Sequence, residues 1–159
     1  MTERRYVVLD LFVFHAITSN DVDLFSKTTT VLRLIKDKCH IILLTRTLRN
    51  EYWRRIKEIE RSRGGAYSSI LLRFIISLLT NRDKVDDVEE SPRELPREVV
   101  PENDLPLVRA ALSKPAVNIV VITTDRRHLV DNEKLKMYLR RENPGIEIIH
   151  LDDYSKLDP

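Results

Sequence analysis

Short apolar runs alternate along this chain with longer segments of helical periodicity, and this alternation limits the folds that the chain can adopt. Runs at 5–11, 39–44, 118–123 and 146–151 are nearly continuous in apolar residues, as in strands buried on both faces. Strands that alternate with helices form a mainly parallel sheet with helices on both sides. We therefore expect an α/β fold of three layers (α/β/α) around a mainly parallel central sheet of about 4–5 strands.

The segments between these runs carry helix signals. Asn20 or Asp21 is a suitable N-cap for a helix with apolar positions Leu24, Phe25, Thr28, Val31, Leu32 and Ile35. Thr45 or Thr47 opens a second helix with a stripe of Leu48, Tyr52, Ile56 and Ile59, ended by Arg63-Gly64-Gly65. Further helices are expected at 66–80, at 104–114 and around Leu135, Tyr138 and Leu139, the last stopping at 143–145. The segment 66–80 is apolar around nearly its whole circumference, which predicts burial in the core or in a dimer contact.

A length of 159 residues is the size of one domain, so we expect a single domain over 1–159. Within it, the Pro-containing residues 83–102 hold eight acids and three bases and predict a mobile excursion at about 81–103. Cys39, the single cysteine, excludes an intramolecular disulfide and is expected to be buried.

The apolar stretch at 70–79 is too short to span a bilayer, which needs about 20 residues, and the N-terminus lacks a signal-peptide pattern. We therefore expect a cytoplasmic protein without a membrane partner. The chain is rich in arginine and contains no glutamine, a composition that points to a thermophile.

Basic residues are concentrated in two segments. Residues 46–63 hold seven bases and three acids, and a second cluster consists of Arg126, Arg127, Lys134, Lys136, Arg140 and Arg141. Such surfaces attract polyanions, because neutralising phosphates supplies most non-specific affinity for nucleic acids. A solvated helix face with ion pairs is the alternative.

Four acids are expected at the carboxyl edge of the sheet, where ligands bind in open α/β folds. Asp10 ends the first strand, Asp125 follows the strand at 118–123, Glu51 lies early in the helix after the second strand, and Asp104 opens the helix before that third strand. Each has a structural alternative: an N-cap for Asp104, a turn for Asp125 and an exposed helix acid for Glu51. Asp10 interrupts an apolar run, so it should meet a cation.

Clustered carboxylates repel one another, and a hard divalent cation relieves this repulsion. Ligands that are all carboxylates suit Mg²⁺ or Mn²⁺. Such an ion supports phosphodiester hydrolysis.

At these residues the chain resembles the PIN domain family of metal-dependent ribonucleases, which includes VapC-type toxins and ribosome-maturation nucleases. The resemblance lies in YVVLD at 6–10, LRNEYWRRI at 48–56, DLPLVRAAL at 104–112 and VVITTDRRHL at 120–129. It implies that Asp10, Glu51, Asp104 and Asp125 bind the metal and that Thr123 supports them. The family usually has Asn, Ser or Thr two residues after the first acid, whereas this chain has Phe12.

The resemblance implies hydrolysis of single-stranded or looped RNA, leaving 3′-hydroxyl and 5′-phosphate ends. Arg126, Arg127 and Arg49 are expected to hold the RNA backbone, and Trp53 to stack on bases. Tyr52 lies on the apolar stripe and is expected in the core, and the histidines show no metal-ligand spacing.

Three functions are therefore weighed. The first is an endoribonuclease dependent on Mg²⁺ or Mn²⁺, with the toxin of a toxin–antitoxin pair as one role, an antitoxin or other protein as partner, and a homodimer as one assembly. The second, motivated by Phe12 and the acidic segment, is a catalytically weak PIN-like module that binds RNA or a ribosomal partner. The third is a doubly wound regulatory or small-molecule domain in which the acids are only caps.

Overall fold

The computed structural model describes residues 5–62, 68–91, 93–115 and 117–157. A five-stranded parallel sheet in the order β3-β2-β1-β4-β5 forms its centre. The strands are β1 (Tyr6–Leu9), β2 (Ile41–Thr45), β3 (Val85–Val88), β4 (Ile119–Thr123) and β5 (Ile146–His150). The predicted parallel α/β fold is confirmed.

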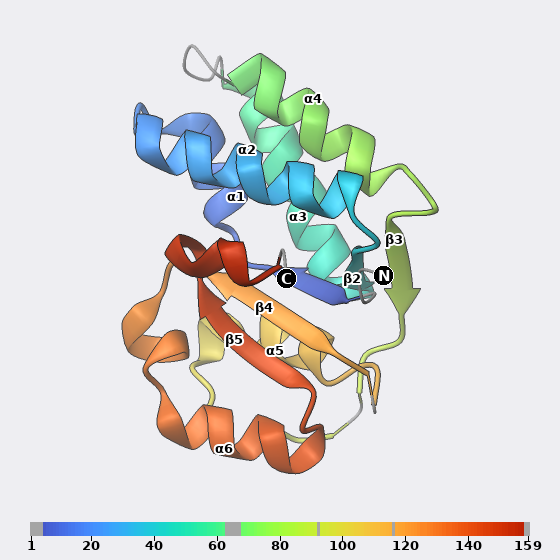
Figure 1. Cartoon of the computed structure of the whole chain (residues 1–159), viewed down its shortest axis with the longest axis vertical. Helices are drawn as coiled ribbons and strands as arrows, with labels where there is room; N and C mark the ends of the chain where they lie inside the picture. The colour runs from blue at the N-terminus through green and yellow to red at the C-terminus, as the bar shows by residue number, and fades with distance from the viewer. Residues whose placement is uncertain (1–4, 63–67, 92, 116, 158–159) are drawn as a thin grey trace.

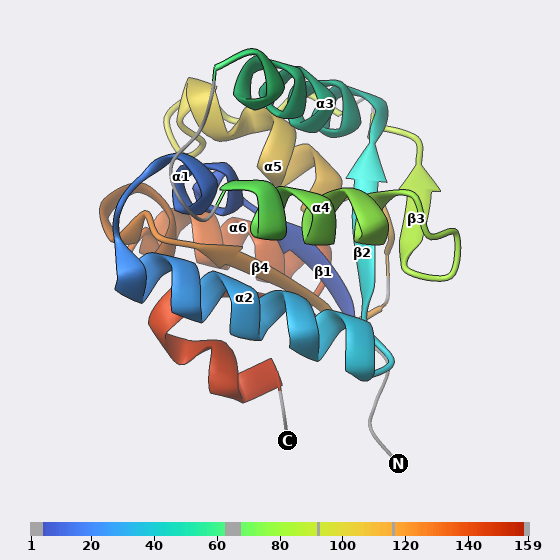
Figure 2. The same cartoon turned by 90° about the horizontal axis from the view of Figure 1, so that it is seen from above.

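Helices cover the sheet in layers. They are α1 (Phe12–Thr18), α2 (Val22–Asp37), α3 (Arg46–Arg61), α4 (Ser68–Leu79), α5 (Leu105–Ala111) and α6 (Glu133–Glu142). Figure 1 shows α2 and α4 together on one side of the sheet and α5 and α6 on the other. In Figure 2, α3 lies beside β2 and close to α5, and these elements are in contact. Three shorter helical segments complete the fold: η1 (Glu102–Asp104), η2 (Arg126–Val130) and η3 (Leu151–Leu157).

The predicted caps and apolar stripes account for the two long helices. The Asp21 carboxylate accepts a hydrogen bond from the Leu24 N–H at the start of α2, and the Thr45 hydroxyl accepts one from the Leu48 N–H at the start of α3. The α3 stripe is buried as predicted: Leu48, Tyr52, Ile56 and Ile59. The helix ends at Arg61, and the predicted stop signal at 63–65 lies outside the described residues.

Three predictions differ from the structure in whole or in part. The acidic segment is not an excursion from the fold, because residues 85–88 form the edge strand β3 and both Leu95 and Val100 are buried in the core. Cys39 is exposed, since β2 begins only at Ile41. The helix α4 buries Leu71, Ile75 and Leu78 in the core, whereas Ile70 is 68% exposed, so the core covers one face of this helix and the alternative of a dimer contact stays a prediction.

Besides β3, the elements α1 and η3 are among those absent from the sequence predictions. Residues 12–18 form α1, which begins without a side-chain cap and continues the apolar run after β1. Residues 151–157 form η3, which packs against α2. There the Lys27 ammonium lies 2.6 Å from the Asp152 carboxylate. No helix in the described part of the chain is both long and apolar enough to cross a membrane.

Candidate functional site

The carboxyl ends of β1 and β4 bring Asp10 and Asp125 together through a shared hydroxyl. These two central strands are neighbours, with Leu9 paired to Ile122. The Thr123 hydroxyl donates a hydrogen bond to Asp10 Oδ2 at 2.6 Å and accepts one from the Asp125 N–H at 3.0 Å. The Leu11 N–H donates a second hydrogen bond to Asp10, at 2.7 Å to Oδ1. Thr123, which is fully buried, therefore connects the Asp10 carboxylate to the backbone of Asp125.

Asp104 reaches the same edge from α5 and is half-buried there. Burial raises the pKa of its carboxyl group to about 6, and the negative charges of Asp10 and Asp125 contribute to this rise, while His128 acts in the opposite direction. Asp104 precedes α5 but its side chain makes no capping hydrogen bond, so the structural alternative of an N-cap is not supported. Asp10, Asp104 and Asp125 thus form one electrostatically coupled group, which we call the acid cluster.

Asp125 has a structural role as well. Its Oδ1 accepts a hydrogen bond from the His128 N–H at 2.9 Å, which caps η2. Its Oδ2 lies 3.2 Å from His128 Nδ1. Asp125 therefore caps a helical segment, where the structural alternative from sequence was a turn, and the same carboxylate also acts on Asp104. His128 is a site residue that the sequence analysis discounted, and its position three residues after Asp125 was the available signal.

Glu51 lies near the acid cluster, but arginines bind its carboxylate. A cavity of about 240 Å³ is lined by Asp10 and Glu51, together with Glu102 and Asn103 from the segment before α5. Glu51 Oε1 lies 2.5 Å from Arg54 Nη2 and 3.5 Å from Arg55 Nε. These arginines, Arg54 first, lower the pKa of Glu51. The structure thus places Glu51 in the same cavity as Asp10 with its charge already neutralised.

The position of α3 beside this edge is fixed by Tyr52. Its hydroxyl donates a hydrogen bond to the Leu9 carbonyl oxygen at the end of β1. The side chain is buried, as predicted for the core. Burial raises the pKa of Tyr52, and the negative charge of Asp10 adds to this effect. Tyr52 therefore ties the strand that carries Asp10 to the helix that carries Glu51.

The predicted RNA-binding residues occupy different environments. Arg126 is 3.4 Å from Asp152, Arg49 forms an ion pair with Asp87, and Arg127 is exposed. Trp53 is half-buried against the hydrophobic core. Arg126 and Arg127 directly follow Asp125 in the chain, so they are the bases that lie nearest to the acid cluster in sequence.

Phe12 is 2% exposed at the start of α1, so this position supplies core packing and no polar group. In the described residues, no three His, Cys, Asp or Glu side chains are grouped in a way that could hold a metal ion as they stand. The carboxylates nevertheless have the chemistry that Mg²⁺ and Mn²⁺ prefer, and their mutual repulsion favours a cation.

No family model, curated protein or solved structure matched the chain.

Proposed function

We propose that the protein is a metal-dependent endoribonuclease of the PIN type. The observation that supports this best is Asp104: its carboxyl group sits half-buried beside Asp10 and Asp125, and its pKa is raised to about 6. Burial is the larger cause of this rise and the two neighbouring negative charges add to it, and strongly shifted groups concentrate at functional sites. An open sheet edge with three coupled acids is a suitable place for a divalent cation.

In this proposal Asp10, Asp104 and Asp125 are the metal ligands, and Glu51 becomes a ligand when its carboxylate leaves Arg54. A bound Mg²⁺ or Mn²⁺ would supply an acidic water and positive charge for the phosphoryl oxygens. The Thr123 hydroxyl fixes the rotamer of Asp10, and the His128 N–H fixes that of Asp125. Arg126 and Arg127 follow Asp125 and would hold the RNA backbone.

The decisive experiment is cleavage of a mixed pool of single-stranded RNA with Mn²⁺ and with EDTA. We expect cleavage only with the metal. Asp10→Asn and Asp104→Asn should each reduce it about 100-fold or more, because such an ion contributes several kcal/mol to the transition state. Asp37→Asn is the matched control. Asp37 is an exposed acid at the C-terminus of α2, which leads to the start of β2 and not to the carboxyl edge of the sheet.

A binding measurement separates metal binding from catalysis. Mn²⁺ should raise the melting temperature of the parent protein, because a ligand that binds only the folded state stabilises it. Asp104→Asn should remove this response, and Asp37→Asn should keep it. A parent protein that neither cleaves RNA nor responds to Mn²⁺ would refute the nuclease and favour acids that act only as caps.

A second function, an RNA-binding module with little or no catalysis, is favoured by two observations. Phe12 is buried where the PIN pattern has a polar residue, and Glu51 is bound by Arg54 and Arg55. In that case the protein should bind single-stranded RNA and Mn²⁺ without cleaving the pool. The cleavage assay therefore distinguishes the two functions directly.

A toxin of a toxin–antitoxin pair is the cellular role that we propose for the nuclease, with an antitoxin as its protein partner. Expression of the parent chain in bacteria should then arrest growth, and expression of Asp10→Asn should not. Equal growth with both chains, at equal protein levels and with cleavage demonstrated in vitro, would refute the toxin role and leave the nuclease intact.

A further inference from the structure

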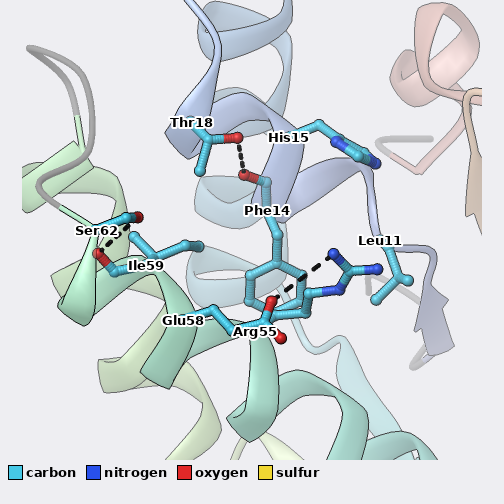
Figure 3. Close-up of a pocket in the computed structure, with 8 residues that line it drawn as sticks. All are labelled: Leu11, Phe14, His15, Thr18, Arg55, Glu58, Ile59 and Ser62. Carbon is cyan, nitrogen blue, oxygen red and sulfur yellow. Dashed lines mark hydrogen bonds and ion pairs between the residues drawn. The ribbon is translucent and has the colours of Figure 1, made fainter.

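A second pocket lies between α1 and α3. Its volume is about 160 Å³, and Phe14, Arg55 and Ile59 are among the residues that line it, together with the polar side chains of His15, Thr18 and Ser62. Figure 3 shows Phe14 extending from α1 toward α3, which contributes Arg55, Glu58 and Ile59. We call this the α1–α3 pocket.

The α1–α3 pocket adjoins the cavity that Asp10 and Glu51 line. Leu11, the residue after Asp10, lines both. Arg55 lines the α1–α3 pocket and its Nε lies 3.5 Å from Oε1 of Glu51, which lines the other cavity. Leu11 and the Arg55–Glu51 ion pair therefore lie between the two cavities.

The lining combines an aromatic floor with a polar rim. The ring of Phe14 is 96% buried and is held in place edge-on to the Tyr52 ring, with centroids 5.4 Å apart and planes at 62°. At the rim, the Thr18 hydroxyl donates to the Phe14 carbonyl at 3.3 Å and the Ser62 hydroxyl donates to the Ile59 carbonyl at 3.4 Å. Both hydroxyl oxygens keep lone pairs that can accept hydrogen bonds. Such a lining suits a flat ring with polar edges.

Arg55 adds a cationic wall with incomplete hydrogen bonding. Its Nε is buried and forms an ion pair with Glu51 at 3.5 Å that lacks hydrogen-bond geometry, and its Nη1 lies 4.0 Å from Glu58 Oε2, at the outer limit of an ion pair. An unsatisfied buried donor is costly, so a small rotation of the guanidinium toward an acceptor in the pocket is favourable. Guanidinium planes also stack on nucleobases.

We propose that the α1–α3 pocket receives one unpaired nucleobase of the RNA, next to the phosphodiester that lies over the acid cluster. This proposal rests on the proposed nuclease function and adds a base-binding subsite to it. The pocket is smaller than the roughly 300–1,000 Å³ of sites for drug-sized ligands, which favours a single heteroaromatic ring system. Unpaired bases are commonly recognised by this combination of an aromatic surface, an arginine and polar contacts at the base edge.

The test is an abasic scan of a short single-stranded RNA. One abasic nucleotide is moved along the RNA, and binding to the whole protein is measured by fluorescence anisotropy in EDTA, where the proposed cleavage is off. We expect one position at which loss of the base weakens binding about 5- to 100-fold, the range for a stacked base. Thr18→Met and Ser62→Leu, which fill the pocket from opposite sides, should abolish this position dependence while metal-dependent cleavage of the RNA pool persists.

Thr80→Met is the matched control for Thr18→Met. Thr80 is also exposed at the end of a helix, and its hydroxyl also donates to the carbonyl four residues earlier, at 2.7 Å to Ile76. This variant should keep the position dependence. A flat scan with a protein that cleaves RNA would overturn the subsite alone, and so would a position dependence that survives both pocket variants. A parent protein that neither cleaves nor binds RNA would overturn the nuclease and the subsite together.

Discussion

Acidic residues lie on both halves of the sheet's carboxyl edge. On one half they form ion pairs with arginines, and on the other half their negative charges repel one another. Beyond β2 and β3, Glu51 is bound by Arg54 and Arg55, and Asp87 by Arg49. Beyond β1 and β4, the Thr123 hydroxyl contacts the Asp10 carboxylate and the Asp125 N–H, and burial, together with the negative charges of Asp10 and Asp125, raises the pKa of Asp104.

The first arrangement is that of ordinary surface ion pairs, which contribute about 0–1 kcal/mol each. The second costs the folded chain stability, and a cation would relieve that cost. The proposed metal site therefore lies at β1 and β4, and Glu51 is a neighbouring acid that Arg54 and Arg55 bind.

Among the residues that support the acids, the largest effect is expected at the Thr123 hydroxyl. Thr123→Val should lower metal-dependent cleavage about 10- to 100-fold, because removing a partner that orients a metal ligand typically has an effect of this size. Thr123→Ser, which keeps the hydroxyl, should recover most of the activity. Initial cleavage rates at several Mn²⁺ concentrations provide the measurement, and a valine variant as active as the parent would place the site elsewhere.

The raised pKa of Asp104 should make the free energy of unfolding depend on pH. Its pKa is about 6 in the folded protein and 3.8 ordinarily, so between these pH values the folded chain holds more protons than the unfolded chain. The free energy of unfolding should therefore fall as the pH rises through this window. Asp104→Asn removes this contribution and should stabilise the metal-free protein at pH 7 by about 1–2 kcal/mol, allowing for solvent screening.

Urea unfolding of the parent and of Asp104→Asn at pH 4 and pH 7 tests this expectation. The difference between the two proteins should be larger at pH 7, and Asp37→Asn should show no such dependence. An Asp104→Asn protein that is less stable than the parent at pH 7 would mean that this carboxylate is satisfied in the fold, and the contrast between the two halves of the edge would disappear.

The smallest effect on stability is expected at the paired half. Arg54→Ala should change the free energy of unfolding by less than about 1 kcal/mol, as for other exposed ion pairs. The same substitution frees the Glu51 carboxylate and should tighten Mn²⁺ binding measured by calorimetry. Arg61→Ala, an exposed arginine in the last turn of α3, is the control. Unchanged Mn²⁺ affinity in Arg54→Ala would exclude Glu51 from the metal site.

An element of the fold could be predicted from sequence where its burial required a recognisable run or stripe of apolar residues. Both central strands and β2 are buried throughout or nearly so, and they were recognisable as apolar runs. The edge strand β3 has the sequence Val-Asp-Asp-Val, and its two acids form ion pairs with Lys114 and Arg49. It was missed because it contains no run of apolar residues. The helix α1 was missed because no capping side chain separates it from the apolar residues before it.

Within the candidate site, the positions of residues at strand ends could be predicted from the expected parallel sheet. Asp10 and Asp125 directly follow adjacent parallel strands, so their proximity was predictable from the strand order alone. The direction of the Glu51 carboxylate was not predicted, although Arg54 and Arg55 stand at the spacing that lets helix side chains pair. The α1–α3 pocket depends on a helix that was not foreseen, so no sequence signal pointed to it.

The acids of β3 have a consequence for the behaviour of the protein at high concentration. A strand at the edge of a sheet offers its backbone groups to strands of other molecules, and charged side chains there oppose such pairing. Asp86 and Asp87 place this charge on the outermost strand next to β2, with Lys114 and Arg49 holding them. The same residues that obscured β3 in the sequence therefore protect the sheet against intermolecular β-aggregation.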